Sequence, residues 1–281
     1  MDFSHTSKAI LENDGKAPYI TFPALSKIPF IKHGFSTRIG GVSKDCLSTM
    51  NLDFSREDRA NVLKNFQIIS DSIGLKYEDL VFSHQVHKTN VRLVTNEDKG
   101  KGIIRDRDYS DIDGLITNTP GIPLVTFYAD CVPLYFVDTK NKAIGLSHSG
   151  WRGTVSRMGE ETVEAMKKEF GSSPKDIVAV IGPSICKDCY EVSEDVAIEF
   201  YSIFTKDQCL DIIEKKENNK YQLDLWMANL HILLDAGLQA ENIHISGVCT
   251  ACNSDLLFSH RASKGKRGSL AAFLTIKNDV D

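Results

Sequence analysis

Three strand-like runs, residues 123–128, 133–137 and 143–148, follow one another so closely that no helix fits between them. Parallel neighbours need a crossover of a dozen or more residues, whereas antiparallel neighbours need only a short turn. Elsewhere, strand-like runs alternate with helical patterns. The sequence therefore predicts an α/β fold with a mixed sheet, or two sheets flanked by helices, and not a strictly doubly wound parallel sheet.

The other elements are marked by apolar runs and by helix-end signals. One helix is predicted to start at Ser55 as N-cap, with Asp58 three residues on, and to end at Gly74. A second helix is predicted over residues 155–170. Two more helices are predicted to begin near Ser193 and Asp224. The remaining strands are predicted at residues 19–22, 32–36, 80–85, 91–94, 114–117, 177–181, 243–248 and 270–276.

Composition limits the class of protein. A chain of 281 residues with 42% hydrophobic residues is long enough for one large domain or two small ones. It contains no repeat or linker that would divide it, so we expect a single domain over residues 1–281, with residues 1–16 as a flexible N-terminal extension. The net charge of -5 lacks the basic footprint of nucleic-acid binding, which favours a small-molecule partner.

Targeting signals and cysteine usage favour the cytoplasm. Residues 1–16 mix charged and polar residues and lack the apolar core of a signal peptide. The longest apolar stretch, residues 121–137, is interrupted by Asp130 and two prolines, so buried strands are predicted and no membrane span. Seven cysteines, an odd number, favour free thiols and metal ligands over a disulfide framework.

Three short segments concentrate soft metal donors. They are Ser-His-Gln-Val-His at 83–87, Ala-Asp-Cys-Val-Pro-Leu at 129–134 and Ser-His-Ser-Gly-Trp-Arg-Gly at 147–153. They offer His87, Cys131 and His148, a donor set that suits zinc, and three protein ligands leave a fourth tetrahedral position for water or substrate. Taken singly, each His is more often a structural histidine and Cys131 a buried thiol.

The order of motifs resembles that of the laccase-domain, YfiH-type family over residues 33 to about 276. The matching motifs are His-Gly-Phe-Ser-Thr-Arg-x-Gly-Gly-Val-Ser (33–43), Asn-Leu-Asp (51–53), Gln-Val-His (85–87), Asp-Gly-Leu-Ile-Thr (113–117), the 129–134 and 147–153 segments, Ile-Gly-Pro-Ser-Ile (181–185), Cys-Tyr-Glu-Val (189–192), Asp-Leu-Trp-x-Ala-Asn (224–229), Cys-Thr (249–250) and Phe-Ser-His-Arg (258–261).

The resemblance implies a four-layer α/β/β/α sandwich in which His87, Cys131 and His148 hold zinc. It also implies purine nucleoside phosphorylase activity with additional adenosine deaminase activity. Other descriptions of the family are polyphenol oxidase and peptidoglycan editing factor. Adenosine, inosine, guanosine and methylthioadenosine are the candidate nucleosides, with phosphate as co-substrate.

Zinc accounts for both phosphorylase and deaminase chemistry. An open zinc position can polarise a leaving group, or lower the pKa of bound water to about 7 and so supply hydroxide for deamination. A copper oxidase would instead need several histidine clusters, but the chain has eight histidines and no His-x-His pair. Copper is therefore less favoured than zinc.

Phosphate recognition requires an arginine fork. Its planar guanidinium donates paired hydrogen bonds to an oxyanion and keeps its charge. The candidates, in order, are Arg38 before a Gly-Gly loop, Arg152 after His148, and Arg261 after Phe-Ser-His. Two acidic residues complete the predicted site, Asp113 as a substrate contact and Asp130 as a catalytic residue that orients the Cys131 loop without binding metal.

One motif departs from the family. The C-terminal strand of the family is commonly entered through Thr-Gly-Arg, whereas this chain has Arg267, Gly268 and Ser269 there. Arg267 or Lys266 is the candidate replacement for the missing arginine. The alternative is that residues 264–267 form a solvated turn.

Two further Cys-x-x-Cys pairs have the spacing of metal ligands: Cys186 with Cys189, and Cys249 with Cys252. They could form a closed four-thiolate zinc site, but residues 190–248 separate them, far more than the about 15 to 20 residues of a compact zinc ribbon. The family resemblance accounts for Cys189 and Cys249 only. A second zinc is left open at this point.

Three alternative functions also remain. Cys131 could be a nucleophile with His148 as base in a hydrolase or peptidoglycan-precursor editing enzyme. The chain could be a copper polyphenol oxidase. It could also be a non-catalytic nucleoside- or muropeptide-binding protein with a structural metal.

Overall fold

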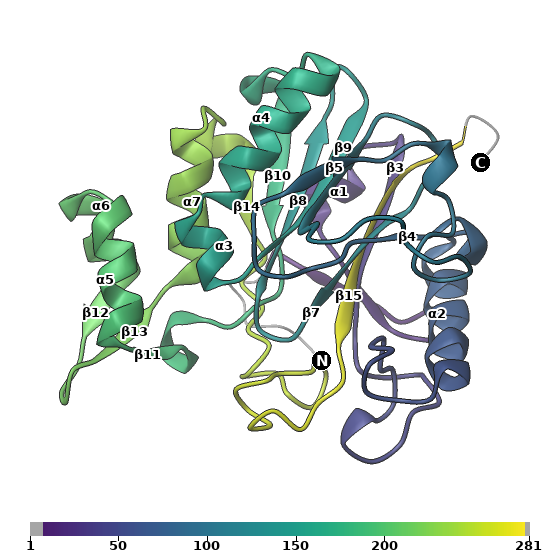
Figure 1. Cartoon of the computed structure of the whole chain (residues 1–281), viewed down its shortest axis with the longest axis horizontal. Coiled ribbons are helices and arrows are strands. Elements are labelled where there is room, and N and C mark those ends of the chain that lie inside the picture. The colour runs from purple at the N-terminus through teal and green to yellow at the C-terminus, as the bar shows by residue number, and fades with distance from the viewer. Residues whose placement is uncertain (1–7, 279–281) are drawn as a thin grey trace.

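The computed structural model describes residues 8–278, and two six-stranded sheets dominate it (Figure 1). In the first sheet the strands are antiparallel except for the β4 and β7 pair, which is parallel. Its strands, in spatial order, are β1 (Ile10–Glu12), β2 (Tyr19–Thr21), β3 (Ile31–Ser36), β15 (Leu270–Ile276), β7 (Leu124–Tyr128) and β4 (Val81–Phe82).

The second sheet is also mixed. Its strands, in spatial order, are β14 (Ile243–Ile245), β10 (Ile177–Ile181), β8 (Val132–Asp138), β9 (Ala143–Ser149), β6 (Gly114–Thr117) and β5 (Val91–Leu93). The two outer pairs, β10 with β14 and β5 with β6, are parallel, and the inner pairs are antiparallel. The close spacing of β7, β8 and β9 thus produces antiparallel pairing of β8 with β9, as predicted.

The two sheets pack face to face. Tyr135 and Leu146 of the second sheet share a buried cluster with Tyr128, Ala272 and Leu274 of the first. Every residue of β8, β9 and β15 is buried, which explains why these strands are continuous apolar runs. The two sheets therefore share one buried core.

Helices cover the outer face of each sheet. On the first sheet, α2 (Arg59–Ile73) packs Phe66 and Ile69 against Phe82 and Phe273. On the second sheet lie α4 (Met158–Phe170) and α7 (Leu225–Asp235) (Figure 1). Two shorter helices are α1 (Pro23–Ser26) and α3 (Trp151–Val155). The predicted α/β/β/α sandwich with mixed sheets is confirmed.

Two predicted helix boundaries were wrong. The N-cap of α2 is Asp58, whose side chain accepts a hydrogen bond from the Ala60 amide, and not Ser55. Ser55 instead bonds Asp53, in a loop that precedes the helix. The helix predicted over residues 155–170 is divided, because Arg157 has a left-handed backbone with φ of 60°.

A small lobe lies beside the second sheet; its three-stranded sheet was not predicted, whereas its first helix was, since that helix has Ser193 as its N-cap. The lobe contains a three-stranded sheet of β11 (Glu191–Ser193), β13 (Lys220–Leu223) and β12 (Ile213–Lys215), with α5 (Glu194–Ile203) and α6 (Lys206–Ile212). Figure 1 shows these elements together at the left. Two of the strands have only three residues, and polar residues interrupt them, so no apolar run marks them in the sequence.

The predicted N-terminal extension, residues 1–16, is partly in the fold. Ile10–Glu12 form β1, which pairs with β2 at the edge of the first sheet, while residues 1–7 lie outside the described part of the chain. Over residues 8–278, none of the helices is long and apolar enough to cross a membrane.

Candidate metal centre

Three side chains far apart in the sequence meet at one end of the sandwich. His87 lies in the loop after β4, Cys131 in the bend where the chain passes from β7 in one sheet to β8 in the other, and His148 on β9. Their donor atoms all lie within 4.8 Å of one another. Cys131 Sγ is 4.0 Å from His87 Nε2, and the two imidazole rings are nearly perpendicular, with centroids 4.8 Å apart.

Asp113 fixes both histidines. Its Oδ1 accepts a hydrogen bond of 2.8 Å from His148 Nδ1, and its two oxygens also accept from the backbone amides of Val86, His87 and Lys88 at 3.0 to 3.1 Å. Burial alone would raise the pKa of Asp113, but the bonds from His148 and the Val86 amide hold it below its usual value. Because Nδ1 of His148 is committed, its Nε2 is the atom left for a ligand.

The Cys131 thiolate and the protonated His148 imidazole stabilise each other as an ion pair. Burial opposes ionisation of Cys131, yet His148 and His87 lower its pKa to about 6. Burial likewise opposes protonation of His148, yet the Cys131 thiolate and Asp113 raise its pKa to about 9. A metal ion requires the thiolate and the neutral imidazole, so binding here would release the imidazolium proton.

Gly150 provides room for the centre. A Cβ at this position would lie 2.9 Å from His87 Cδ2 and 3.1 Å from Cys131 Sγ. Real Cβ contacts are not that short, so any side chain here would displace the donors. The sequence contained Gly150 within the His-Ser-Gly-Trp motif, but gave no reason to single it out.

Two residues of the site have left-handed backbone, His87 with φ of 63° and Asp130 with φ of 88°. Such strain persists in a non-glycine residue when its surroundings hold it. The carboxylate of Asp130 accepts hydrogen bonds from Thr250 Oγ1 at 2.6 Å and from the Arg261 amide at 2.7 Å. Asp130 thus anchors the 250–261 segment beside Cys131; the expected strand alternation does not apply, because residues 129–131 form a bend.

The three predicted phosphate-binding arginines have other contacts. Arg38 donates to the carbonyls of Ser48 and Ser254. Arg261 donates to the carbonyls of Cys189 and Glu191. Arg152 is exposed and stacks on Trp151, with its guanidinium carbon 4.2 Å from the ring centroid. Phosphate binding by Arg38, Arg152 or Arg261 therefore stays a prediction.

Arg267 and Tyr190 lie in the electrostatic field of the centre. Burial lowers the pKa of Arg267, against the opposing charges of Asp53, Asp130 and Cys131, and its Nε is buried without a hydrogen-bond partner among the described residues. Burial and the Cys131 charge raise the pKa of Tyr190 above its usual range. Tyr190 belongs to the Cys-Tyr-Glu-Val motif, but the sequence did not indicate that the charge of Cys131 acts on it.

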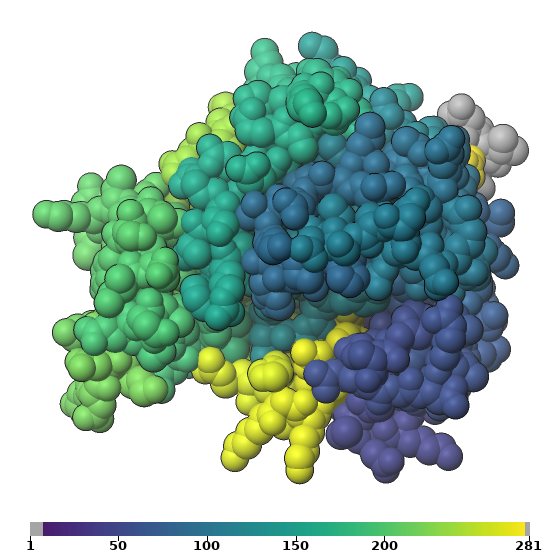
Figure 2. Space-filling model, viewed as in Figure 1, coloured from purple at the N-terminus to yellow at the C-terminus, as the bar shows by residue number. Residues whose placement is uncertain are grey.

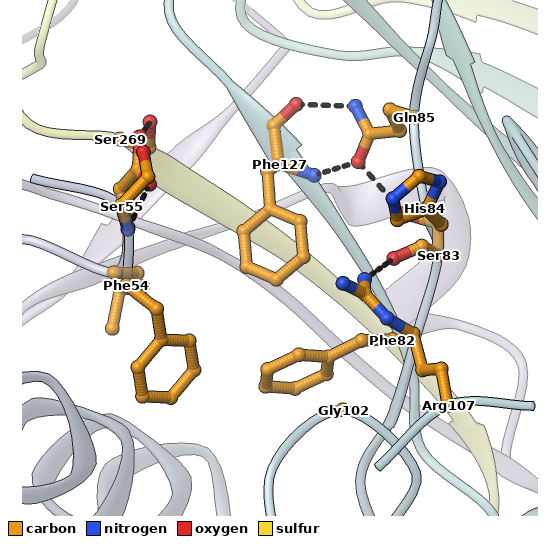
Figure 3. Close-up of a pocket in the computed structure, with 12 residues that line it drawn as sticks. Phe54, Ser55, Phe82, Ser83, His84, Gln85, Gly102, Arg107, Phe127 and Ser269 are labelled. Carbon is orange, nitrogen blue, oxygen red and sulfur yellow. Dashed lines mark hydrogen bonds between the residues drawn. The ribbon is translucent and has the colours of Figure 1, made fainter. Parts of the chain in front are cut away.

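A pocket of about 400 Å³, lined in part by aromatic residues, lies beside the loop after β4 and the residue before β15. Figure 3 shows the rings of Phe54, Phe82 and Phe127 turned toward the same space. Gln85, two residues before His87, forms paired hydrogen bonds with the Phe127 backbone at 2.7 and 2.8 Å. Ser269, the residue that departs from the family motif, lines the same pocket and accepts a hydrogen bond from Arg267 Nη1.

Comparisons with known proteins agree with the resemblance found in the sequence. The family model described as "Multi-copper polyphenol oxidoreductase laccase" matches residues 32–277. A Bacillus subtilis protein named "Purine nucleoside phosphorylase YlmD" is 38% identical over 87% of this chain and 88% of its own. A Bacteroides thetaiotaomicron protein named "Purine nucleoside phosphorylase" is 34% identical over 91% of this chain and 95% of its own.

Solved structures show the same architecture. The crystal structure of the Bacillus licheniformis hypothetical protein YfiH has a TM-score of 0.89 and 30% sequence identity, covering 95% of this chain and 99% of that one. That of YlmD from Geobacillus stearothermophilus has the same TM-score and identity, covering 97% of this chain and all of that one. The fold and the family predicted from the sequence are therefore confirmed.

Proposed function

The chain belongs to the laccase-like family whose model matches residues 32–277, and on that premise we propose that it is a zinc-dependent purine nucleoside phosphorylase. The observation that carries the proposal is the three-donor centre, two nitrogens and one sulfur, with its second histidine fixed by Asp113. Relatives that are 33 to 38% identical have purine nucleoside phosphorylase in their names.

The donor set fits zinc better than a copper cluster. Of the two groups of metal-donor side chains in residues 8–278, only one contains histidine. Multicopper chemistry needs several histidine-rich sites, whereas one cysteine and two histidines suit a zinc ion with an open position. Zinc held by His87, Cys131 and His148 would supply Lewis-acid polarisation, or a hydroxide for adenosine deamination.

Phosphorolysis requires two further binding elements. Phosphate oxygen forms a bond to the anomeric carbon of the sugar, the bond from that carbon to the purine breaks, and the departing base takes up a proton. The products are a purine base and ribose 1-phosphate. Phosphate therefore needs a fixed cation near the centre, and the purine needs an apolar surface.

Arg267 meets the first requirement best. Its guanidinium is partly buried, its Nε has no partner among the described residues, and the charges of Asp130 and Cys131 act on it. Arg267 uses only Nη1 in its printed hydrogen bonds, to the Gly268 carbonyl and to Ser269 Oγ, whereas Arg38 and Arg261 each use two of their nitrogens on backbone carbonyls. We therefore place Arg267 ahead of Arg38, Arg152 and Arg261 as the phosphate ligand, and assign Asp113 to positioning His148.

The aromatic pocket meets the second requirement. Its volume of about 400 Å³ falls in the range of small-molecule sites, about 300 to 1,000 Å³. Phe82 lies between Phe54 and Phe127, with ring centroids 6.3 and 5.1 Å away, but it is only 2% exposed. The half-buried rings of Phe54 and Phe127 are therefore the ones on which a purine can stack. The lining also includes Asp53, Ser55 and Arg107 for polar contacts.

The test is product analysis with adenosine and inosine, with and without phosphate. We expect a free purine base and ribose 1-phosphate only when phosphate is present. Inosine formed from adenosine without phosphate would show the additional deaminase activity. No base release from any purine nucleoside in phosphate would contradict the proposal.

A second candidate is a cysteine-dependent hydrolase, including peptidoglycan-precursor editing. The observation in its favour is the Cys131 thiol, whose pKa of about 6 beside His148 makes it a thiolate at neutral pH. The two candidates differ in whether zinc protects Cys131 from alkylation. A copper oxidase and a non-catalytic binding protein have no such observation of their own.

A further inference from the structure

Four cysteines outside the candidate metal centre converge on one point. Cys186, Cys189, Cys249 and Cys252 place their sulfurs within 4.8 Å of one another. Cys189 Sγ lies 3.4 Å from Cys252 Sγ, and Cys186 Sγ lies 4.0 Å from the same atom. A tetrahedron of sulfurs around zinc, with Zn–S bonds of about 2.3 Å, has sulfurs about 3.8 Å apart, so these spacings match one zinc ion.

Strand pairing explains how two pairs so distant in sequence meet. β10 and β14 are parallel neighbours, with Ile181 opposite Ile245. Each Cys-x-x-Cys pair begins a few residues after the end of its strand, so both pairs leave the sheet at the same edge. A bridge between Ser184 and Cys249 continues the parallel pairing up to the cysteines themselves.

The backbone is already arranged to accept a thiolate. Cys249 Sγ accepts hydrogen bonds from the amides of Cys186 and Cys252 at 3.3 and 3.4 Å. Amide donors to sulfur stabilise negative charge, and such contacts orient the ligands of a metal site. Cys249 is only 5% exposed, which is expected for the inner ligand of a closed structural site.

We propose that Cys186, Cys189, Cys249 and Cys252 bind a second, structural zinc ion in a closed four-thiolate site. Four sulfur ligands leave no open position for substrate, so this ion has no catalytic role of its own. The proposal does not depend on the proposed phosphorylase activity.

This ion would join two segments that form the wall of the first centre. The Ile185 amide donates to the Asp130 carbonyl at 3.0 Å, and Thr250 and the Arg261 amide bind the Asp130 carboxylate. Arg261 also contacts the segment of the first cysteine pair, because its Nη1 donates a hydrogen bond to the Cys189 carbonyl at 3.0 Å. Figure 2 shows the yellow C-terminal segment exposed at the surface near the green lobe.

Zinc analysis of the purified full-length chain tests the proposal. We expect two zinc ions per chain in the unmodified protein, one after Cys131→Ala, and one after the double change Cys186→Ser with Cys252→Ser. Cys46→Ser, at an exposed cysteine outside both groups, is the matched control and should keep two. The double variant should also unfold at a lower temperature, whereas Cys46→Ser should not.

Cobalt substitution keeps the test valid if the double variant fails to fold. In the Cys131→Ala protein the first centre has no sulfur, so sulfur-to-cobalt charge-transfer absorption at tetrahedral intensity must come from the four cysteines. We expect that signal. Zinc content unchanged by the double change Cys186→Ser with Cys252→Ser, no cobalt signal in Cys131→Ala, or a titration under denaturing, non-reducing conditions that finds two or four fewer free thiols than the seven cysteines would overturn the proposal.

Discussion

The Nδ1 atom of His148 lies 2.8 Å from Oδ1 of Asp113, and both side chains are almost completely buried. The same carboxylate accepts a hydrogen bond from the backbone amide of His87. Asp113 therefore holds both histidines of the three-donor group in place. The proposed metal centre would therefore depend on a residue that is not one of its three ligands.

Changing Asp113 to Asn should weaken metal binding. The single oxygen of the asparagine side chain cannot accept hydrogen bonds from His148 and from three backbone amides as the carboxylate does. Loss of such a partner of a metal ligand typically lowers metal affinity by about 10- to 100-fold. Zinc affinity is measured by competition with a chelator. Asp111→Asn, at an exposed residue paired with Lys88, is the control and should leave the affinity unchanged; equal affinities in both variants would remove Asp113 from this role.

Gly150→Ala should empty the first centre while leaving the fold intact. The added methyl would lie 2.9 Å from His87 and 3.1 Å from Cys131. Gly153→Ala, in the α3 helix that Gly150 caps, is the matched control, because its methyl would meet nothing closer than 3.5 Å. Zinc content and circular dichroism separate the two effects. A Gly150→Ala protein with full zinc at this centre would show that its donors can move apart at little cost.

Arg267→Lys should raise the KM for phosphate with little change in zinc content. Lysine keeps the charge but loses the planar fork, and a lost charged hydrogen bond of about 1.5 to 3 kcal/mol corresponds to roughly 10- to 100-fold in binding. Arg38→Lys, measured in parallel, tests Arg38, which the sequence analysis ranked first as the phosphate ligand. Lys266→Gln is the control at an exposed neighbour. A larger effect at Arg38 than at Arg267 would reverse our order.

His33 should make the fold sensitive to mild acid. Burial lowers its pKa from 6.5 to about 4, and its Nε2 accepts a hydrogen bond from the Phe22 amide. Between these two pH values the unfolded chain binds a proton that the folded chain does not, so stability falls as the pH falls from 6.5 and levels off near 4. The limit is about 3 kcal/mol, since each pKa unit is worth about 1.4 kcal/mol.

The measurement is the free energy of unfolding from urea titrations at pH 7 and pH 4.5. His33→Gln keeps an acceptor but does not titrate, so its loss of stability over this interval should be smaller than that of the unmodified protein. His260→Gln, at an exposed histidine, should behave like the unmodified protein. Identical pH dependence in all three proteins would show that His33 does not contribute.

Apolar runs predicted the interior strands well, because burial on both faces leaves a continuous signal. The predicted bounds of β10 and β15 match the structure, β8 is longer than predicted by one residue at each end, and β9 is longer by one residue at its C-terminal end. The small β11, β12 and β13 sheet was missed, since its short strands carry exposed polar residues. The start of α2 was misplaced because Ser55 and Asp58 are both good N-caps.

The sites were predictable to different degrees. Spacing could not connect His87, Cys131 and His148, which lie in separate loops and strands; their donor chemistry suggested the group, and the family resemblance strengthened it. The four-cysteine group was left open, because sequence distance hides the parallel pairing of β10 with β14. Arg267 was already a candidate, because it stands near the place of the family's missing arginine, whereas Gly150 could not be singled out, because the short distances from its Cβ position to His87 and Cys131 exist only in the folded site.

Alkylation of Cys131 tests most directly whether this cysteine serves a zinc-dependent phosphorylase. A zinc-bound thiolate has its lone pair committed to the metal, whereas a nucleophilic thiolate must be free to react. The zinc-loaded and chelated proteins are treated with iodoacetamide, and modification of the Cys131 peptide, zinc content and phosphorolysis are measured together. We predict slow modification and retained activity in the zinc-loaded protein, rapid modification after chelation, and recovery with zinc only where Cys131 is unmodified; rapid modification and inactivation with zinc still bound would contradict the account.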